Sequence, residues 1–128
     1  QLQIGRHLGY FEPPDLLWLE FHGDVSPAQV LEYSAKRAQL LQGQPHILTL
    51  LDVRDLRSPP PEVRAAIARL NDPRPQASAV IGARFQTKVM AELIVKAIYL
   101  FSGKQIELAF FASPEPAHAW LVEKRATI

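Results

Sequence analysis

Apolar residues along the chain gather in two kinds of segment. Some are short, nearly continuous runs, and in others the apolar residues recur every three or four positions, patterns typical of buried strands and of amphipathic helices respectively. The two kinds alternate, and three serine–proline pairs mark where a run gives way to a helical pattern: Ser26-Pro27, Ser58-Pro59 and Ser113-Pro114. Serine is a good N-cap and proline suits the first helical turn, so each pair predicts the start of a helix.

Five strands are expected. Residues 3–11 and 16–21 are separated by Pro13-Pro14-Asp15, a break short enough to favour an antiparallel hairpin. A third strand, 46–53, is so apolar at its centre that we expect burial on both faces. The remaining two predicted strands are residues 76–83 and 105–111.

Four helices are expected, each following a predicted strand. In the first, Ser26 and Gln29 form a capping-box pattern. This first helix is expected from Ser26 to a stop at Gly43, and the second from a Ser58 cap to Leu70, with Asn71-Asp72-Pro73 as its end. The third is expected from Phe85 to Ser102, with a stop at Gly103. The fourth begins at Ser113 and carries Ala117, Trp120 and Leu121 on its apolar face.

Strands that alternate with helices pair in parallel through right-handed crossovers. The pattern therefore predicts an α/β fold whose sheet is mixed and mostly parallel, with about five strands, an N-terminal hairpin and about four helices. A chain of 128 residues is the usual size of one domain, so residues 1–128 are expected to form a single domain.

Composition narrows the function classes. The chain is 48% hydrophobic and 21% charged, has a net charge of +1 and contains no cysteine, which excludes disulfides, thiolate metal sites and cysteine nucleophiles. With so little net charge and no nucleic-acid motif, no nucleic-acid partner is expected. Small secreted domains often need disulfides, so the absence of cysteine favours the cytoplasm, and no secretory signal is visible. We therefore expect a cytoplasmic protein. The longest apolar stretch, 89–101, is too short to span a bilayer.

Charge is unevenly distributed along the chain. Residues 1–53 carry three basic and six acidic side chains, a net charge of −3, whereas residues 54–88 carry seven basic and three acidic ones, a net charge of +4. A basic segment is either an arginine-rich solvated helix face, the commoner case, or a surface that meets phosphates or anionic lipid.

Several motifs are similar to those of a known family. They are Gly23-Asp24-Val25-Ser26 before a helix, Leu51-Asp52-Val53 at the end of an apolar strand, Ala79-Val80-Ile81-Gly82 before a long helix, and Ser113-Pro114-Glu115-Pro116-Ala117-His118-Ala119-Trp120-Leu121. Together they resemble the SpoIIAA-like (STAS/SEC14-type) bacterial proteins over nearly the whole chain. The resemblance implies a STAS/SpoIIAA-like fold and says less about activity.

The resemblance also draws attention to Ser58. STAS anti-sigma-factor antagonists carry Asp-Ser-x-Gly after the central strand, and a partner kinase phosphorylates the serine. Here Arg57 precedes Ser58 and the glycine is absent. A helix cap explains Ser58 by itself, and a phosphosite is the alternative, since phosphate is favourable at a helix N-terminus.

The helix 85–102 is more apolar than one sheet face requires. Lys88, Glu92 and Lys96 form one narrow polar edge, and most other positions are apolar. The surplus must be covered by a neighbouring helix, a second copy in a homodimer, an apolar ligand or a peripheral membrane surface.

The resemblance to SEC14-type folds implies an apolar pocket beneath this helix. Its walls are expected from Val89, Leu93, Ile94, Tyr99 and Phe101, with Trp120 and Phe111 nearby. Arg84 and Lys88, at the start of the helix, are able to meet an acidic head group. We therefore predict a non-enzymatic domain that binds an apolar or lipid-like ligand or a membrane surface. The rival hypothesis is a protein-interaction or regulatory module of the anti-sigma-factor-antagonist kind.

Catalysis has less support. The four histidines never occur in metal-ligand spacing, so neither a metal nor another cofactor is expected. Asp52 is the best-placed acid, because ligands of open α/β sheets bind beyond the carboxyl ends of the strands. With Arg54 and Asp55 nearby, ion pairs are the commoner outcome, and His22 and Asp24 share a turn without a nucleophile.

Overall fold

The computed structural model describes residues 1–70 and 72–128, which form six strands and four helices. In chain order the elements are β1 (Leu2–Ile4), β2 (His7–Glu12), β3 (Leu16–Gly23), α1 (Pro27–Leu40), β4 (Ile47–Leu56), α2 (Pro61–Ala68), β5 (Gln76–Ile81), α3 (Phe85–Ser102), β6 (Ile106–Phe111) and α4 (Pro114–Thr127). The α/β class, the mixed sheet and the four helices agree with the prediction.

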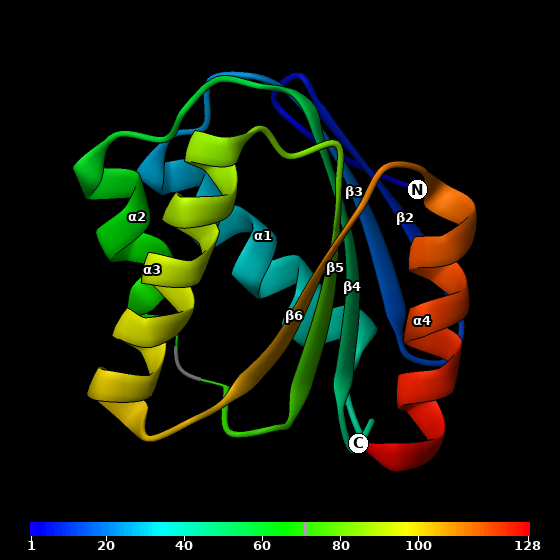
Figure 1. The fold of residues 1–128 in the computed structure, drawn as a ribbon. Coiled ribbons are helices and arrows are strands. Elements are labelled where there is room, and N and C mark those ends of the chain that lie inside the picture. The colour runs from blue at the N-terminus through cyan, green and yellow to red at the C-terminus, as the bar shows by residue number, and fades with distance from the viewer. Residues whose placement is uncertain (71) are drawn as a thin grey trace.

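The six strands form one sheet in which the spatial order is the chain order, β1 to β6. β1, β2 and β3 pair antiparallel, and β3 to β6 pair parallel. Each parallel step moves in the same direction across the sheet, so right-handed crossovers carry α1, α2 and α3 over the same face. α4 follows the last strand and covers the opposite face (Figure 1).

The prediction of a single strand over residues 3–11 was wrong, because this segment forms two strands, β1 and β2. Gly5 lies between β1 and β2 with a φ of +60°, a left-handed conformation that glycine adopts without steric cost. The chain reverses there, and Ile4 pairs with His7. The sheet therefore has six strands where about five were expected.

The three serine–proline pairs differ in what they do. Ser26 is the N-cap of α1, and its hydroxyl accepts from the Gln29 amide while the Gln29 side chain accepts from the Ser26 amide, so the capping box is confirmed. Ser113 is the N-cap of α4 but forms no side-chain cap hydrogen bond.

The Ser58 cap was wrong. β4 continues to Leu56, α2 begins only at Pro61, and Pro60 is its N-cap residue. Three consecutive prolines delay the helix, since a residue before proline is biased toward extended backbone. Asn71, part of the predicted end of this helix, lies outside the described residues. The helix 85–102 and its left-handed stop at Gly103 are confirmed.

The face of the sheet beneath α4 is closed by a dense core. Leu50 on β4 is 0% exposed, and so are the other members of this cluster, Leu16, Leu48, Ala77, Ala79, Ile81, Ala117 and Leu121. The small side chains Ala77 and Ala79 on β5 leave room for α4 to approach the strands closely.

The opposite face, beneath α1, α2 and α3, is packed only in part. A second cluster of buried residues there consists of Leu17, Leu41 and Ile47, near the C-terminal end of α1 and the start of β4. Within α3, only Ile98 is buried. The three-helix layer therefore meets the sheet at one end and leaves space elsewhere.

Candidate functional site

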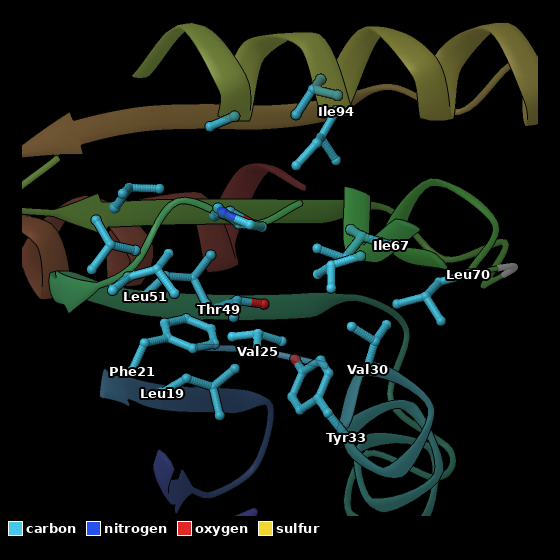
Figure 2. A pocket seen from close by; sticks show the side chains of 18 of the residues that line it. Leu19, Phe21, Val25, Val30, Tyr33, Thr49, Leu51, Ile67, Leu70 and Ile94 are labelled. Atoms are coloured by element: carbon cyan, nitrogen blue, oxygen red, sulfur yellow. The ribbon is translucent and has the colours of Figure 1, made fainter. Parts of the chain in front are cut away.

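A cavity of about 250 Å³ lies between the sheet and the layer formed by α1, α2 and α3. Figure 2 shows the side chains of Leu19, Leu51, Ile67 and Ile94 around this space, with Ile94 reaching down from α3 toward the strands. The space is larger than the ~150 Å³ apolar cavity that admits benzene in an engineered protein. It is therefore large enough to hold a small apolar molecule.

The strands supply one wall of the cavity through their alternation. On β4, Thr49, Leu51 and Val53 face the cavity, and the residues between them face the other side of the sheet. The helices supply the opposite wall. Their main apolar side chains toward the cavity are Val30 of α1, Val63 and Ile67 of α2, and Met90, Ile94, Val95 and Ile98 of α3.

One end of the cavity is polar. Tyr33 and Arg37 of α1, Thr49 of β4, Gln76 of β5 and Lys104 before β6 all line it. Thr49, Gln76 and Lys104 lie in or next to the first residues of their parallel strands, whereas Leu51 and Val53 lie further along β4. The cavity is therefore mostly apolar, and its charged groups, Arg37 and Lys104, lie at the amino ends of the parallel strands.

Arg37 is the most unusual of these groups. It is 6% exposed, its Nε is buried without a hydrogen-bond partner, and none of the ion pairs among the described residues involves it. Its guanidinium carbon lies 5.5 Å from the centroid of the Tyr33 ring, a cation–π distance. Burial raises the pKa of the Tyr33 hydroxyl, against the opposing influence of Arg37 and Thr49.

Lys104 is the second cation at this end. Burial lowers its pKa to about 8, although the Asp72 carboxylate opposes that shift, and Arg37 and Arg74 lower it further. Its ammonium group donates to the backbone carbonyl of Asp72. Lys104 also lines a second hollow on the surface, together with Asp72, Pro73, Pro75, Ser102, Gly103 and Gln105, so it stands between the cavity and the outside.

The carboxylate near Lys104 already has a partner. Arg74 Nη2 lies 2.7 Å from Asp72 Oδ2, and Arg74 Nε donates to Asp72 Oδ1 at 3.0 Å. The hydrogen bonds from Arg74 lower the pKa of Asp72 to about 2, against the effect of burial. Asp72 and Arg74 therefore neutralise each other, and the charges of Arg37 and Lys104 remain at the cavity.

The predicted pocket residues on α3 are divided between two sides of the helix. Ile94 lines the cavity. Val89, Leu93, Tyr99 and Phe101 do not line it and are between 41% and 73% exposed. Most of the residues proposed as pocket walls therefore lie on the outer side of the helix.

The other predicted ligand contacts do not gather at the cavity either. Arg84 is the exposed N-cap residue of α3, and Lys88 Nζ lies 5.7 Å from the centroid of the Phe110 ring. Trp120 belongs to α4 and packs against the core on the opposite face of the sheet, with its ring 5.9 Å from that of Phe111. Neither Arg84, Lys88 nor Trp120 lines the cavity.

Sequence reasoning missed the polar end of the cavity, although α1 carried a signal. Val30, Tyr33, Arg37 and Leu41 follow one another at spacings of three or four, so they share one face of the helix. An arginine on the inward face of an amphipathic helix is the pattern that marked this site. Lys104, in the turn before β6, had no comparable signal.

Ser58, the predicted phosphosite, is exposed in the connection between β4 and α2. Its hydroxyl lies 3.9 Å from the sulfur of Met90 on α3 and is not used as a helix cap. Phosphorylation of this serine stays a prediction.

The groups considered for catalysis are engaged with one another. Asp52 Oδ2 lies 2.6 Å from Arg54 Nη2, and hydrogen bonds from Arg54 lower the pKa of Asp52. His22 Nδ1 lies 3.0 Å from Asp55 Oδ2. Among residues 1–70 and 72–128, no three or more histidine or acidic side chains are grouped as a metal site would require.

None of the helices in the described part of the chain combines the length and apolar character needed to cross a membrane. This agrees with the sequence, in which Glu92 and Lys96 interrupt the longest apolar stretch.

Comparison with known proteins identifies the fold. An uncharacterized protein of the DUF3478 family with a SpoIIAA-like fold, from Shewanella loihica PV-4, is similar in structure, with a TM-score of 0.58 and 16% sequence identity over 90% of this chain and 91% of that one. No protein family model matches the chain, and no curated protein matches it. The chain therefore has a SpoIIAA-like fold, as the sequence motifs indicated.

Proposed function

We propose that this domain binds a small apolar or lipid-like molecule in the cavity between the sheet and α1, α2 and α3, and that it makes and breaks no covalent bond. One observation carries the proposal. On the face of the sheet beneath α4 the core side chains are 0% exposed, whereas the opposite face borders a cavity. On the hollow side β4 still presents the apolar side chains of Leu51 and Val53.

The physical argument concerns the walls of the cavity. Apolar side chains beside an empty space lose the dispersion contacts that a packed core gives. A ligand that fills this space restores those contacts and removes further apolar surface from water, which contributes about 25 cal/mol per Å² buried. An apolar cavity of this size in a sheet–helix fold is therefore suited to hold a molecule.

The side chains considered for catalysis lie outside the cavity and are paired with neighbouring charged groups, which favours binding over catalysis. Asp52 is held by Arg54 and His22 by Asp55, so neither is positioned as a free base facing the cavity. The cavity itself is lined mostly by aliphatic and aromatic side chains, which is typical of binding sites.

The proposal is tested by native mass spectrometry of the protein purified from its own organism, with extraction of bound small molecules, and by titration with the neutral fluorescent probe N-phenyl-1-naphthylamine. Ile94 and Leu93 are adjacent on α3, but only Ile94 lines the cavity and Leu93 is 52% exposed. Ile94→Trp should fill the space and abolish probe binding, whereas Leu93→Trp should leave it unchanged. Equal effects of both substitutions, or no binding by the unaltered protein, would reject the proposal.

A second candidate function, a protein-interaction or regulatory module, is favoured by the outer side of α3. Phe85, Leu93, Leu100 and Phe101 on this helix are more than half exposed. Apolar surface of this kind, on a SpoIIAA-like fold, suits a contact with another protein, a second copy of the chain or a membrane surface. Leu100→Lys should abolish such a contact without changing probe binding, and sedimentation velocity and vesicle flotation separate the three partners.

A further inference from the structure

The charge distribution of the cavity, as well as its volume, indicates which ligand fits it, because its two ends differ in charge. The cations Arg37 and Lys104 line the end at the start of the parallel strands, whereas Leu51, Val53 and Ile94 lie further along a lining that is mostly apolar. A ligand that fits both ends has a hydrocarbon part and a polar part.

The burial of Arg37 indicates which kind of head group this end of the cavity favours. Taking a guanidinium out of water is costly unless an anion and hydrogen bonds compensate for the loss of solvent. Arg37 is 6% exposed, and the residues that the structure describes give its Nε no hydrogen-bond partner and its guanidinium no ion pair. The neighbouring Tyr33 offers its ring, at a cation–π distance of 5.5 Å, and its neutral hydroxyl group, neither of which carries a countercharge.

The neighbouring carboxylate does not meet this need. Asp72 is already bonded to Arg74 through two pairs of atoms, Nη2–Oδ2 at 2.7 Å and Nε–Oδ1 at 3.0 Å. The ammonium group of Lys104 is directed to a backbone carbonyl, which carries no net charge. Among the described residues, the three cations Arg37, Arg74 and Lys104 therefore share the single carboxylate of Asp72 at this end of the cavity.

We propose that the cavity accommodates an amphipathic anion, whose charged head group lies between Arg37 and Lys104 and whose hydrocarbon chain extends along Leu51 toward Ile94. This inference rests on the proposed function and adds the chemical class of the ligand. The edge of a guanidinium pairs two N–H donors with two oxygens of a carboxylate or phosphate, and a lysine adds a point charge.

Thr49 and Tyr33 place hydroxyl groups at the same end. Figure 2 shows the Tyr33 hydroxyl directed from α1 toward the sheet, where Thr49 lies. Because burial keeps the pKa of Tyr33 above its ordinary value, this hydroxyl retains its proton and is able to donate a hydrogen bond to an anion. The polar end thus offers both positive charge and neutral donors.

The test compares four probes with chains of equal length by isothermal titration calorimetry: decanoate, decyl phosphate, decan-1-ol and decylamine. We expect one or both anions to bind at least ~10-fold more tightly than decan-1-ol, as charge-assisted hydrogen bonds imply. The anion that binds more tightly identifies the head group as carboxylate or phosphate. Decylamine should bind least, because it brings a third positive charge to Arg37 and Lys104.

Variants separate the head-group site from the cavity as a whole. Arg37→Met and Lys104→Met should each reduce the preference for the anions over decan-1-ol by ~10-fold or more, with decan-1-ol binding retained. Lys96→Met removes a cation from the exposed side of α3 and is the matched control, with no expected change. Circular dichroism of each variant checks that it is folded. If Arg37→Met does not fold, Lys104→Met still tests the inference.

The outcomes are distinguishable. Equal affinity for decan-1-ol and both anions would overturn the head-group inference while leaving the apolar cavity in place. Failure of all four probes, together with no binding of N-phenyl-1-naphthylamine, would overturn the proposed function itself. An anion preference that survives in both Arg37→Met and Lys104→Met would also reject the assignment of these residues.

Discussion

Leu50 and Leu51 are consecutive on β4, yet Leu50 is 0% exposed beneath α4 while Leu51 lies on the wall of the cavity and stays partly accessible. Adjacent strand residues point to opposite sides of a sheet, so this pair compares the two faces directly. On one side the side chain meets a closed core, and on the other it borders open space.

This difference predicts opposite responses to an added ring. Leu50→Phe should lower the free energy of unfolding by about 1–3 kcal/mol, because a packed core does not admit extra volume. Leu51→Phe should change it by less than about 1 kcal/mol, since the ring enters the cavity. Urea denaturation followed by circular dichroism measures both. Equal destabilisation by the two substitutions would mean that the cavity is closed in solution.

The two serines before α1 and α2 make a second matched pair. Ser26→Ala removes the side-chain acceptor of a capping box and should cost about 0.5–2 kcal/mol of stability. Ser58→Ala removes only a weak contact with the Met90 sulfur at 3.9 Å and should stay within about 0.5 kcal/mol of the unaltered protein. Thermal unfolding of both variants measures these changes in stability. A large loss of stability in Ser58→Ala would indicate a structural role for that serine.

The sequence predicted the fold well because the signals for the fold are local. The capping box at Ser26 and Gln29, the left-handed stop at Gly103 and the limits of the helix 85–102 all depend on residues close together in the chain. The turn at Gly5 was missed, because the apolar pattern continues across it and only the positive φ divides the strand.

The site was harder to predict, because it depends on how far the helices stand from the sheet. Periodicity indicated that α3 has more apolar surface than it needs, but not which side chains face the strands. Ile94 faces the cavity, whereas its neighbour Leu93 faces outward. The ion pair of Asp72 with Arg74 is local, but the position of Lys104 beside them joins segments 32 residues apart in the chain, which no local pattern encodes.

Acid should destabilise the protein through Asp72. Its pKa is about 2 in the folded state and ordinarily 3.8, so the folded state binds the proton less readily than the unfolded state. The stabilisation, about 2 kcal/mol, is present above the ordinary pKa and is lost as pH falls from about 4 toward 2. In Asp72→Asn this part of the acid dependence should disappear.

Urea denaturation at a series of acidic pH values measures this effect. Glu123→Gln, which alters an exposed carboxylate on α4, is the control and should keep the acid dependence of the unaltered protein. An unchanged acid profile in Asp72→Asn would show that the ion pair with Arg74 does not contribute to stability.

Ligand affinity should depend on pH in the alkaline range through Lys104. Its pKa is about 8 because burial disfavours the ammonium form; the Asp72 carboxylate acts in the opposite direction, and Arg37 and Arg74 act with burial. Decanoate is ionised throughout this range, and the arginines keep their charge, so only the lysine among these groups titrates as pH rises from about 7 to about 10. The affinity for decanoate should therefore fall several-fold across this interval.

Titration calorimetry at several pH values tests this dependence against that of decan-1-ol, whose binding should stay constant. Lys104→Met should bind decanoate weakly at every pH, with no alkaline fall, because the titrating group is gone. The hydroxyl of Tyr33 does not account for such a fall, since burial moves its pKa upward and it stays neutral. If Lys104→Met kept the pH dependence of the unaltered protein, the head group would not lie beside Lys104.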